Sequence, residues 1–149
     1  MSDERSRWDS VADEMSERLG GRRVEFGRHV SYWFENSPRR ALYSMSYYKF
    51  AAKLIGGAKR VLDVGCGEGL GTWLLAKECG YARGVDLDED AIGVAQRNWD
   101  DERIDFDCVD FLAEDPGTWD AITNFDVIEH ILPEHAPPFL SRIAAALAH

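Results

Sequence analysis

The chain has 149 residues, of which 45% are hydrophobic and 30% charged, and this is enough apolar sequence for one packed domain. Its net charge of -10 argues against binding to a nucleic-acid backbone. The sequence has neither an apolar run of about 18 residues nor a basic leader before an apolar stretch, so we expect no membrane span, no secretory signal and a cytoplasmic protein.

The first predicted element is an amphipathic helix near the N-terminus. Apolar side chains recur at helical spacing from Trp8 to Leu19, and two glycines at positions 20 and 21 end the pattern. A stretch rich in aromatic residues, at positions 22–36, follows without a clear period. Its cluster at Tyr32, Trp33 and Phe34 suits the packing of helices, because aromatic side chains bury a large area.

A second helix is expected at residues 38–55. Ser37 and Pro38 supply its N-cap and first residue, and the glycines at positions 56 and 57 end it. Its large apolar side chains are expected to face inward, and these are Leu42, Met45, Phe50 and Leu54. We therefore divide the chain into a helical cap segment, residues 1–57, and a core, residues 58–149.

Charge is distributed unevenly along the chain. Residues 1–60 carry 12 Lys and Arg against 8 Asp and Glu, a net charge of +4, whereas residues 61–149 carry 5 against 19, a net charge of -14. The basic residues of the first part could dock on the acidic body, stay solvated, or receive an anionic substrate. They include Arg22, Arg23, Arg28, Arg39 and Arg40.

The most informative motif begins the core, where a strand runs into four glycines. Residues 61–64 are apolar except for Asp63 and suit a buried parallel strand. The glycines remove every second Cβ atom, so the backbone can adopt positive φ and approach a ligand closely. They are Gly65, Gly67, Gly69 and Gly71. A helix is expected from Thr72, and its first amide groups would point back at the loop.

A second strand, expected at residues 82–85, ends at Asp86, 21 residues after Gly65. Folds that bind mononucleotides place a carboxylate for the ribose hydroxyls at this separation. Leu70 stands where a dinucleotide-binding turn needs a small residue, and no lysine follows the glycines until Lys77. A pyrophosphate-binding turn and a P-loop are therefore both disfavoured, which leaves a nucleoside-like ligand without phosphates.

The remaining elements alternate between helix and strand. We expect a helix at 88–98, strands at 104–109 and 121–125, and a last helix at 133–148. Such alternation predicts a parallel sheet with right-handed crossovers and a ligand site at the carboxyl ends of its strands. The cysteines lack metal-ligand or C-x-x-C spacing, so we expect reduced thiols and no metal site. They are Cys66, Cys79 and Cys108.

These residues resemble the class I S-adenosylmethionine-dependent methyltransferase family over about residues 58–148. Residues 61–69 are similar to the family's first motif, and residues 84–88 to its second-strand motif. Residues 106–111 are similar to its third strand, and residues 119–130 to its fourth strand and the turn that follows. The resemblance implies an α/β, Rossmann-like fold with N-terminal helices, a parallel sheet in the order 3-2-1-4, and S-adenosylmethionine at the carboxyl ends of strands 1 and 2.

The resemblance also implies roles in cofactor binding. The glycine turn would hold the methionine portion and Asp86 the ribose, while Asp110 and Phe111 would lie at the adenine. The expected cofactor site consists of Asp63, Gly65, Cys66, Gly67, Gly69, Asp86, Leu87, Val109, Asp110, Phe111 and Asn124. From the residues alone, Asp63 could instead stabilise the amides of the turn, and Asp86 could neighbour a helix N-terminus. Cys66 could be only a small residue of the turn.

A catalytic base is needed only where the acceptor holds its proton, because the sulfonium already activates the methyl carbon. Asp126 and His130 are the expected catalytic candidates. They are four residues apart, so a helical turn would put them on one side. His130 could equally be a structural member of a Glu-His pair at that turn. His29 is a second candidate base on the acceptor side.

Residues 124–127 read Asn-Phe-Asp-Val and lack the motif of enzymes that methylate amino groups on bases or glutamine. This favours a small-molecule methyl acceptor, with S-adenosylhomocysteine as the product of the cofactor. Two alternatives are a non-catalytic S-adenosylmethionine-binding module and an NAD(P)-dependent oxidoreductase.

The chain departs from the family at its end. Family members continue with a fifth strand and a final hairpin, whereas this chain stops at His149. A sheet that ends at strand 4 would leave backbone groups unpaired along that edge. We therefore expect a truncated chain, a fragment or a subunit, in which a second copy or a partner chain covers the strand-4 edge.

Overall fold

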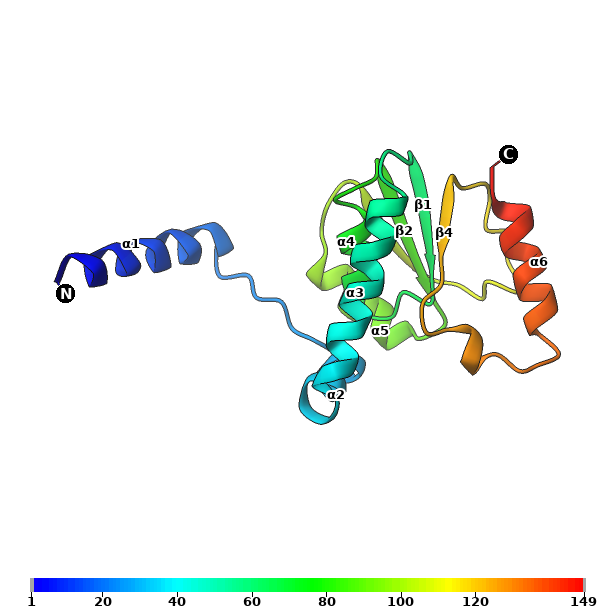
Figure 1. Cartoon of the computed structure of the whole chain (residues 1–149), viewed down its shortest axis with the longest axis horizontal. Helices are drawn as coiled ribbons and strands as arrows, with labels where there is room; N and C mark the ends of the chain where they lie inside the picture. The colour runs from blue at the N-terminus through cyan, green and yellow to red at the C-terminus, as the bar shows by residue number, and fades with distance from the viewer. Residues whose placement is uncertain (1, 149) are drawn as a thin grey trace.

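The described residues form a parallel sheet of four strands with helices on both faces (Figure 1). The computed structural model describes residues 2–148, with side chains from residue 7 onward. Every strand pairing is parallel and the order is β3-β2-β1-β4, so the predicted topology is confirmed. The strands are β1 (Arg60–Val64), β2 (Tyr81–Asp86), β3 (Ile104–Cys108) and β4 (Ala121–Thr123).

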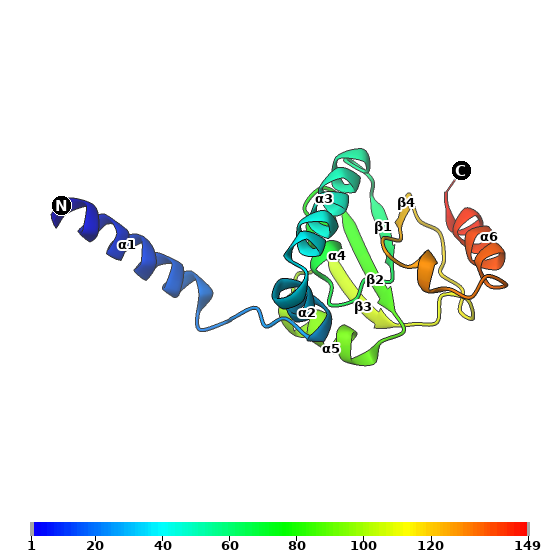
Figure 2. The same cartoon turned by 60° about the horizontal axis from the view of Figure 1, so that its bottom comes forward.

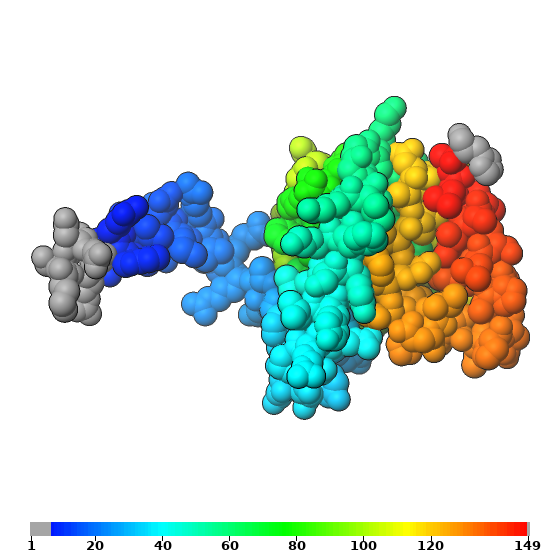
Figure 3. Space-filling model, in the orientation of Figure 1, coloured from blue at the N-terminus to red at the C-terminus, as the bar shows by residue number. Residues whose placement is uncertain are grey.

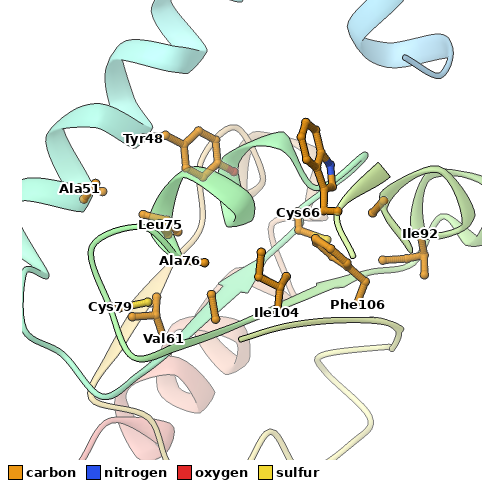
Figure 4. Packing of buried hydrophobic residues seen from close by; sticks show 14 residues of the cluster. Tyr48, Ala51, Val61, Cys66, Leu75, Ala76, Cys79, Ile92, Ile104 and Phe106 are labelled. Carbon is orange, nitrogen blue, oxygen red and sulfur yellow. The ribbon is translucent and has the colours of Figure 1, made fainter. Parts of the chain in front are cut away.

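Each face of the sheet has its own hydrophobic cluster. Side chains alternate along a strand, so Val61 points to one face and Leu62 to the other. Figure 4 shows the first cluster, which the sheet forms with its helices. The second cluster contains Trp119 and Phe139. The first face carries α3 (Pro38–Leu54), α4 (Leu70–Leu75) and α5 (Glu89–Asn98), and the second carries α6 (Ala136–Ala146).

The first helix, α1 (Ser2–Leu19), extends away from the rest of the molecule in two views (Figures 1 and 2). The predicted helix is confirmed, but its apolar side packs on no other element: Trp8 is 72% exposed and Leu19 52%. Neither α1 nor any other helix in the described part of the chain is long and apolar enough to cross a membrane.

A helix that the sequence did not reveal, α2 (Arg28–Asn36), precedes α3. It occupies the aromatic-rich stretch, where no element was predicted. Only Val30 of this helix is buried, and the aromatic rings of Tyr32 and Phe34 are exposed, so its apolar residues follow no clean period. It packs beside α3 (Figure 2).

The helix predicted at 38–55 is confirmed as α3, but the prediction of its inward face was wrong. The large side chains Leu42, Met45, Phe50 and Leu54 are exposed, by 71% in the case of Leu54. Figure 3 shows α3 on the surface of the molecule. The difference follows from the space between the two helices. The small buried residues of α3 let it lie close to α4, and the gap has room for a single aromatic ring, that of Tyr48. The buried residues of α3 are Ala41, Ser44, Tyr48, Ala51 and Ala52.

Several other boundaries differ from the prediction: α4 begins at Leu70 rather than 72, β3 ends at Cys108 rather than 109, and α6 begins at Ala136 rather than 133. Strand β4 ends at Thr123 rather than 125, and α6 ends at Ala146 rather than 148. After α6 the chain turns extended, and Leu147 forms a parallel bridge with Trp119. The Ala148 amide donates to the Trp119 carbonyl at 2.8 Å, so backbone pairing competes successfully with another turn of helix. A partner for the edge of β4 itself stays a prediction.

Replacing Gly71 by alanine tests the close approach of α3 and α4. A Cβ atom at this position would lie 1.9 Å from Cζ of the Tyr48 ring. We expect Gly71→Ala to lower the free energy of unfolding by about 1–3 kcal/mol, because the ring has no free space to enter. Urea denaturation of the purified protein measures this change.

Gly56→Ala is the matched control for this experiment. A Cβ at Gly56 would approach no atom closer than 3.6 Å. We expect a change within about 0.5 kcal/mol. Equal stability of the Gly71 variant and the wild type would contradict the close packing of α3 on α4.

Candidate functional site

A cavity of about 580 Å³ opens at the carboxyl ends of β1, β2 and β3, beneath α2 and α3. This volume suits a small-molecule ligand. We call its three sides the strand-end wall, the helical roof and the β4 turn. The strand-end wall consists of Gly65, Cys66, Gly67, Asp86, Leu87, Val109, Asp110 and Phe111; the roof includes His29, Trp33, Phe34 and Arg40; the β4 turn contributes Phe125, Asp126 and His130.

The glycine loop has the backbone conformation that the sequence predicts. Gly65, Gly67 and Gly69 have φ values of 77°, 54° and 77°. A Cβ on Gly65 would lie 2.2 Å from Val127, and one on Gly69 would lie 2.6 Å from the Phe106 ring. At Gly67 it would meet no atom within 4 Å. Gly67 is therefore the point at which bare backbone faces the open cavity.

Asp86 holds this loop in place. One carboxylate oxygen accepts from the Gly67 amide at 2.8 Å and the other from the Asp88 amide at 3.0 Å. The side chain is half-buried and lines the cavity, and each oxygen keeps a lone pair for a hydroxyl donor. Asp88 caps the N-terminus of α5, so Asp86 lies beside a helix start and in the cavity wall at once.

The other end of the strand-end wall forms an apolar slot. Leu87, Val109 and Phe111 line it, and the Phe111 ring is fixed edge-on to Phe139 at a centroid distance of 5.3 Å. Asp110 is exposed at its rim, where its carboxylate accepts from the Leu112 amide at 2.9 Å. A flat ring system with a polar edge would fit between these groups.

The structure corrects the prediction for Asp63, which has no exposed surface and does not line the cavity. Its carboxylate accepts from the hydroxyls of Thr72 and Thr123 at 2.7 Å each, and from Tyr48 at 3.3 Å. It thus joins β1 to α4, β4 and α3. Burial raises the pKa of Asp63 to about 6, against the opposing effect of these hydrogen bonds.

Two other residues of the expected cofactor site lie outside the cavity lining. Gly69 packs against Phe106, and Asn124 follows the end of β4. Cys66 does line the cavity, but burial raises the pKa of its thiol well above the usual value, so the group stays protonated. Among the described residues, no three His, Cys, Asp or Glu side chains are placed to hold a metal ion.

Glu68, the residue that anchors the helical roof, was not predicted from the sequence. This carboxylate is 4% exposed and accepts from the amides of Gly27 and His29 at 2.8 Å each, and from Val30 at 3.4 Å. These amides begin α2, whose N-cap position is a glycine without a capping side chain. Glu68 therefore caps a helix about 40 residues away in the chain, a pairing that no local pattern reveals.

A second contact ties the roof to the core at Asp88. Arg28 and His29 both reach its carboxylate, the His29 Nε2 atom at 3.1 Å. The hydrogen bond from Arg28 lowers the pKa of Asp88 to about 2. The predicted docking of the basic segment on the acidic body is thus seen for Arg28. His29, a candidate base, lines the cavity with its ring already paired to Asp88.

The β4 turn brings Asp126 and His130 to the cavity by a different backbone path from the predicted helical turn. Asp126 has φ of 56°, the left-handed region, and a short 3-10 helix, Ile128–His130, follows it. Both side chains line the cavity. Arg40 from the roof pairs with Asp126, with 3.3 Å between Nη2 and Oδ2, and this holds the turn under the roof.

A family model described as a methyltransferase domain matches residues 61–149. This range holds the strand-end wall and the β4 turn, whereas the helical roof precedes it.

Among curated proteins, a ubiquinone biosynthesis O-methyltransferase from Burkholderia multivorans is 32% identical over 110 residues, which are 67% of this chain and 47% of that protein. Another, from Xylella fastidiosa, is 31% identical over 136 residues, which are 84% of this chain and 52% of that protein. The chain thus spans about half the length of these relatives.

Among solved structures, a magnesium protoporphyrin IX methyltransferase from Synechocystis with bound S-adenosylhomocysteine aligns with 93% of this chain and 63% of its own. The TM-score is 0.60 at 23% sequence identity. At this identity the likeness shows a shared fold.

The raised pKa of Asp63 predicts a pH-dependent stability. Its pKa of about 6 in the folded protein lies above the usual value of 3.8, so folding favours the protonated form. The stability from that proton is complete below the unfolded pKa and is lost as pH rises through about 6. Between about pH 3.5 and 7.5 the unfolding free energy of the wild type should fall by about 3 kcal/mol relative to Asp63→Asn.

Urea denaturation of both proteins across this range measures the difference, and the other titrating groups cancel in the comparison. The same series on Asp105→Asn, a change at an exposed carboxylate of β3, serves as the control. A pH-independent difference between wild type and Asp63→Asn would refute the raised pKa.

Proposed function

The chain belongs to the class I S-adenosylmethionine-dependent methyltransferase family, and we propose that it methylates a hydroxyl group of a small molecule with S-adenosylmethionine as donor. The observation that carries this proposal is the pairing of the Gly67 backbone with the Asp86 carboxylate at one cavity wall. The O-methyltransferase names of the relatives favour a hydroxyl acceptor. None of these matches supports the oxidoreductase alternative.

The strand-end wall suits the cofactor. A Cβ atom on Gly67 would enter an open space in which no protein atom lies within 4 Å. This space suits the amino-acid portion of the cofactor. The Asp86 carboxylate has lone pairs free for ribose hydroxyls, since its two contacts are single amide hydrogen bonds. Leu87 and Phe111 form the sides of an apolar slot that suits the adenine ring, and Asp110 lies at its rim.

When bound, S-adenosylmethionine supplies a methyl group on a positively charged sulfur, which the acceptor takes by in-line displacement. The protein mainly aligns the acceptor and excludes water. The helical roof helps to exclude water, because contacts with Glu68 and Asp88 hold α2 over the cavity. The apolar rings of Trp33, Phe34 and Phe125 line the same cavity and limit access of water.

A hydroxyl acceptor must lose its proton during transfer. His130 lines the cavity on the β4 turn, and among the described residues no side chain hydrogen-bonds its ring, so it is our candidate base. Asp126 is paired with Arg40, which suits a positioning role. His29 is the weaker candidate, because Asp88 already binds its ring.

Calorimetry and a methyl-transfer assay test the proposal together. We expect the protein to bind S-adenosylhomocysteine and not NAD, and to move a radioactive methyl group from S-adenosylmethionine to members of a panel of phenols. Binding without transfer to any phenol, amine or thiol would favour the non-catalytic module. Failure to bind S-adenosylhomocysteine would refute the proposal.

Asp86→Ala should weaken binding of S-adenosylhomocysteine by about 1.5–3 kcal/mol, roughly ten- to hundredfold, through loss of a charge-assisted hydrogen bond. Calorimetry measures the change. Asp90→Ala is the control, because its carboxylate is exposed in the first turn of α5, away from the cavity lining. Unchanged affinity in Asp86→Ala would remove Asp86 from the site.

His130→Gln should lower kcat for a phenolic acceptor by roughly 100-fold, as expected for loss of a general base, and leave S-adenosylhomocysteine affinity unchanged. His135→Gln is the matched control, since this exposed histidine lies outside the cavity lining. The phenolic acceptor used is the best one from the panel. A normal kcat in His130→Gln would assign the histidine to structure alone.

A further inference from the structure

We propose that Arg40 forms an anion-binding subsite for the methyl acceptor, between the helical roof and the β4 turn, and that the acceptor is an aromatic hydroxy acid. This inference rests on the proposed function, because it names the substrate class of the same site. Arg40 lies in the first turn of α3, lines the cavity and is in direct contact with Asp126. The subsite consists of Arg40, Trp33, Phe34 and Phe125.

The hydrogen-bonding state of Arg40 points to a missing ligand group. Among the described side chains, its Nε is the buried nitrogen or oxygen atom for which no hydrogen-bond partner exists. A guanidinium carries five N–H donors, and leaving a buried donor unpaired is costly, more so in a charged group. Buried polar groups without partners are rare enough to need an explanation. The side chain as a whole is 42% exposed, so a small rotation of the guanidinium would let a ligand oxygen reach Nε and supply this partner.

The existing ion pair leaves room for a second carboxylate. Asp126 contacts Arg40 through a single Nη2 to Oδ2 approach at 3.3 Å, which is not the two-bond pairing that arginine forms with carboxylates. A ligand carboxylate could take Nε–H together with a terminal N–H. The first turn of α3 contains no acidic side chain, so its amide dipoles add to the positive potential there.

The chemistry around Arg40 selects the rest of the acceptor. Its guanidinium carbon lies 5.8 Å from the centre of the Trp33 ring, and Phe34 and Phe125 line the same cavity. Flat aromatic surfaces beside a planar cation favour a carboxylate attached to an aromatic ring. The hydroxyl of such a ligand would then share the cavity with His130 on the β4 turn.

The charge of the site also favours placing an acid here and not elsewhere. The strand-end wall presents the carboxylates of Asp86 and Asp110, so an anion there would be repelled, whereas the carboxylate beside Arg40, that of Asp126, is balanced by the guanidinium with which it pairs. Arg28 and His29 are engaged by Asp88. Arg40 is therefore the permanently charged basic group of the lining, and its Nε–H is unpaired.

Paired ligands test the subsite directly. The 2-, 3- and 4-hydroxybenzoates and their uncharged hydroxybenzamides are titrated by calorimetry into the protein with and without bound S-adenosylhomocysteine. For at least one isomer we expect the acid to bind about tenfold or more tightly than its amide, as for a charge-assisted pair. In Arg40→Gln this preference should disappear, and S-adenosylhomocysteine affinity should be unchanged.

Arg39→Gln is the matched control, because the neighbouring arginine is exposed and outside the cavity lining, and it should keep the preference. Arg40→Lys should keep only part of it, since an ammonium cannot form the two-donor fork. Thermal unfolding confirms that each variant is folded.

Equal binding of acid and amide by the wild type, or no binding of either, would overturn the subsite. So would an Arg40→Gln protein that keeps the preference. Discrimination between acid and amide in a protein that fails to bind S-adenosylhomocysteine would support the subsite and refute the proposed function alone.

Discussion

The architecture of the site depends on one buried carboxylate. Asp63 ends no strand and touches no cavity, yet its two oxygens collect hydroxyl hydrogen bonds from α3, α4 and β4. A charge in this position is costly unless it is hydrogen-bonded, so each of the three elements is held to one arrangement around it. The glycine loop begins two residues after Asp63, so these hydrogen bonds also fix where the loop starts.

The sequence revealed the parts of the site that lie in one continuous stretch. Gly67 and Asp86 follow from glycine spacing and strand periodicity, and both line the cavity as expected. It did not reveal Glu68, and it named Arg40 only as one of several basic residues that could dock or receive an anion, because the partners of these two residues lie 39 and 86 residues away. The inward face of α3 was misjudged for a related reason: the space left by Gly71 selects Tyr48, and apolarity alone cannot show this.

Charge gives the cavity two unlike ends. The strand-end wall is acidic, as the core sequence indicates, and it meets a roof whose basic side chains come from the segment before residue 60. Arg28 and Arg40 each form an ion pair with a core carboxylate, Asp88 and Asp126 respectively. Ion pairs therefore help to hold the helical roof on the core, whereas the core itself is held by apolar packing. Added salt should weaken the attachment of the roof more than the packing of the core.

Glu68 has a consequence that reaches across the whole cavity. Its backbone belongs to the glycine loop, between Gly67 and Gly69, while its carboxylate caps α2 in the roof. A molecule that binds the glycine loop and orders it therefore also stabilises the position of the helical roof above the acceptor. Linkage makes the effect mutual, so two substrates that never touch should bind cooperatively, each raising the other's affinity by the same factor.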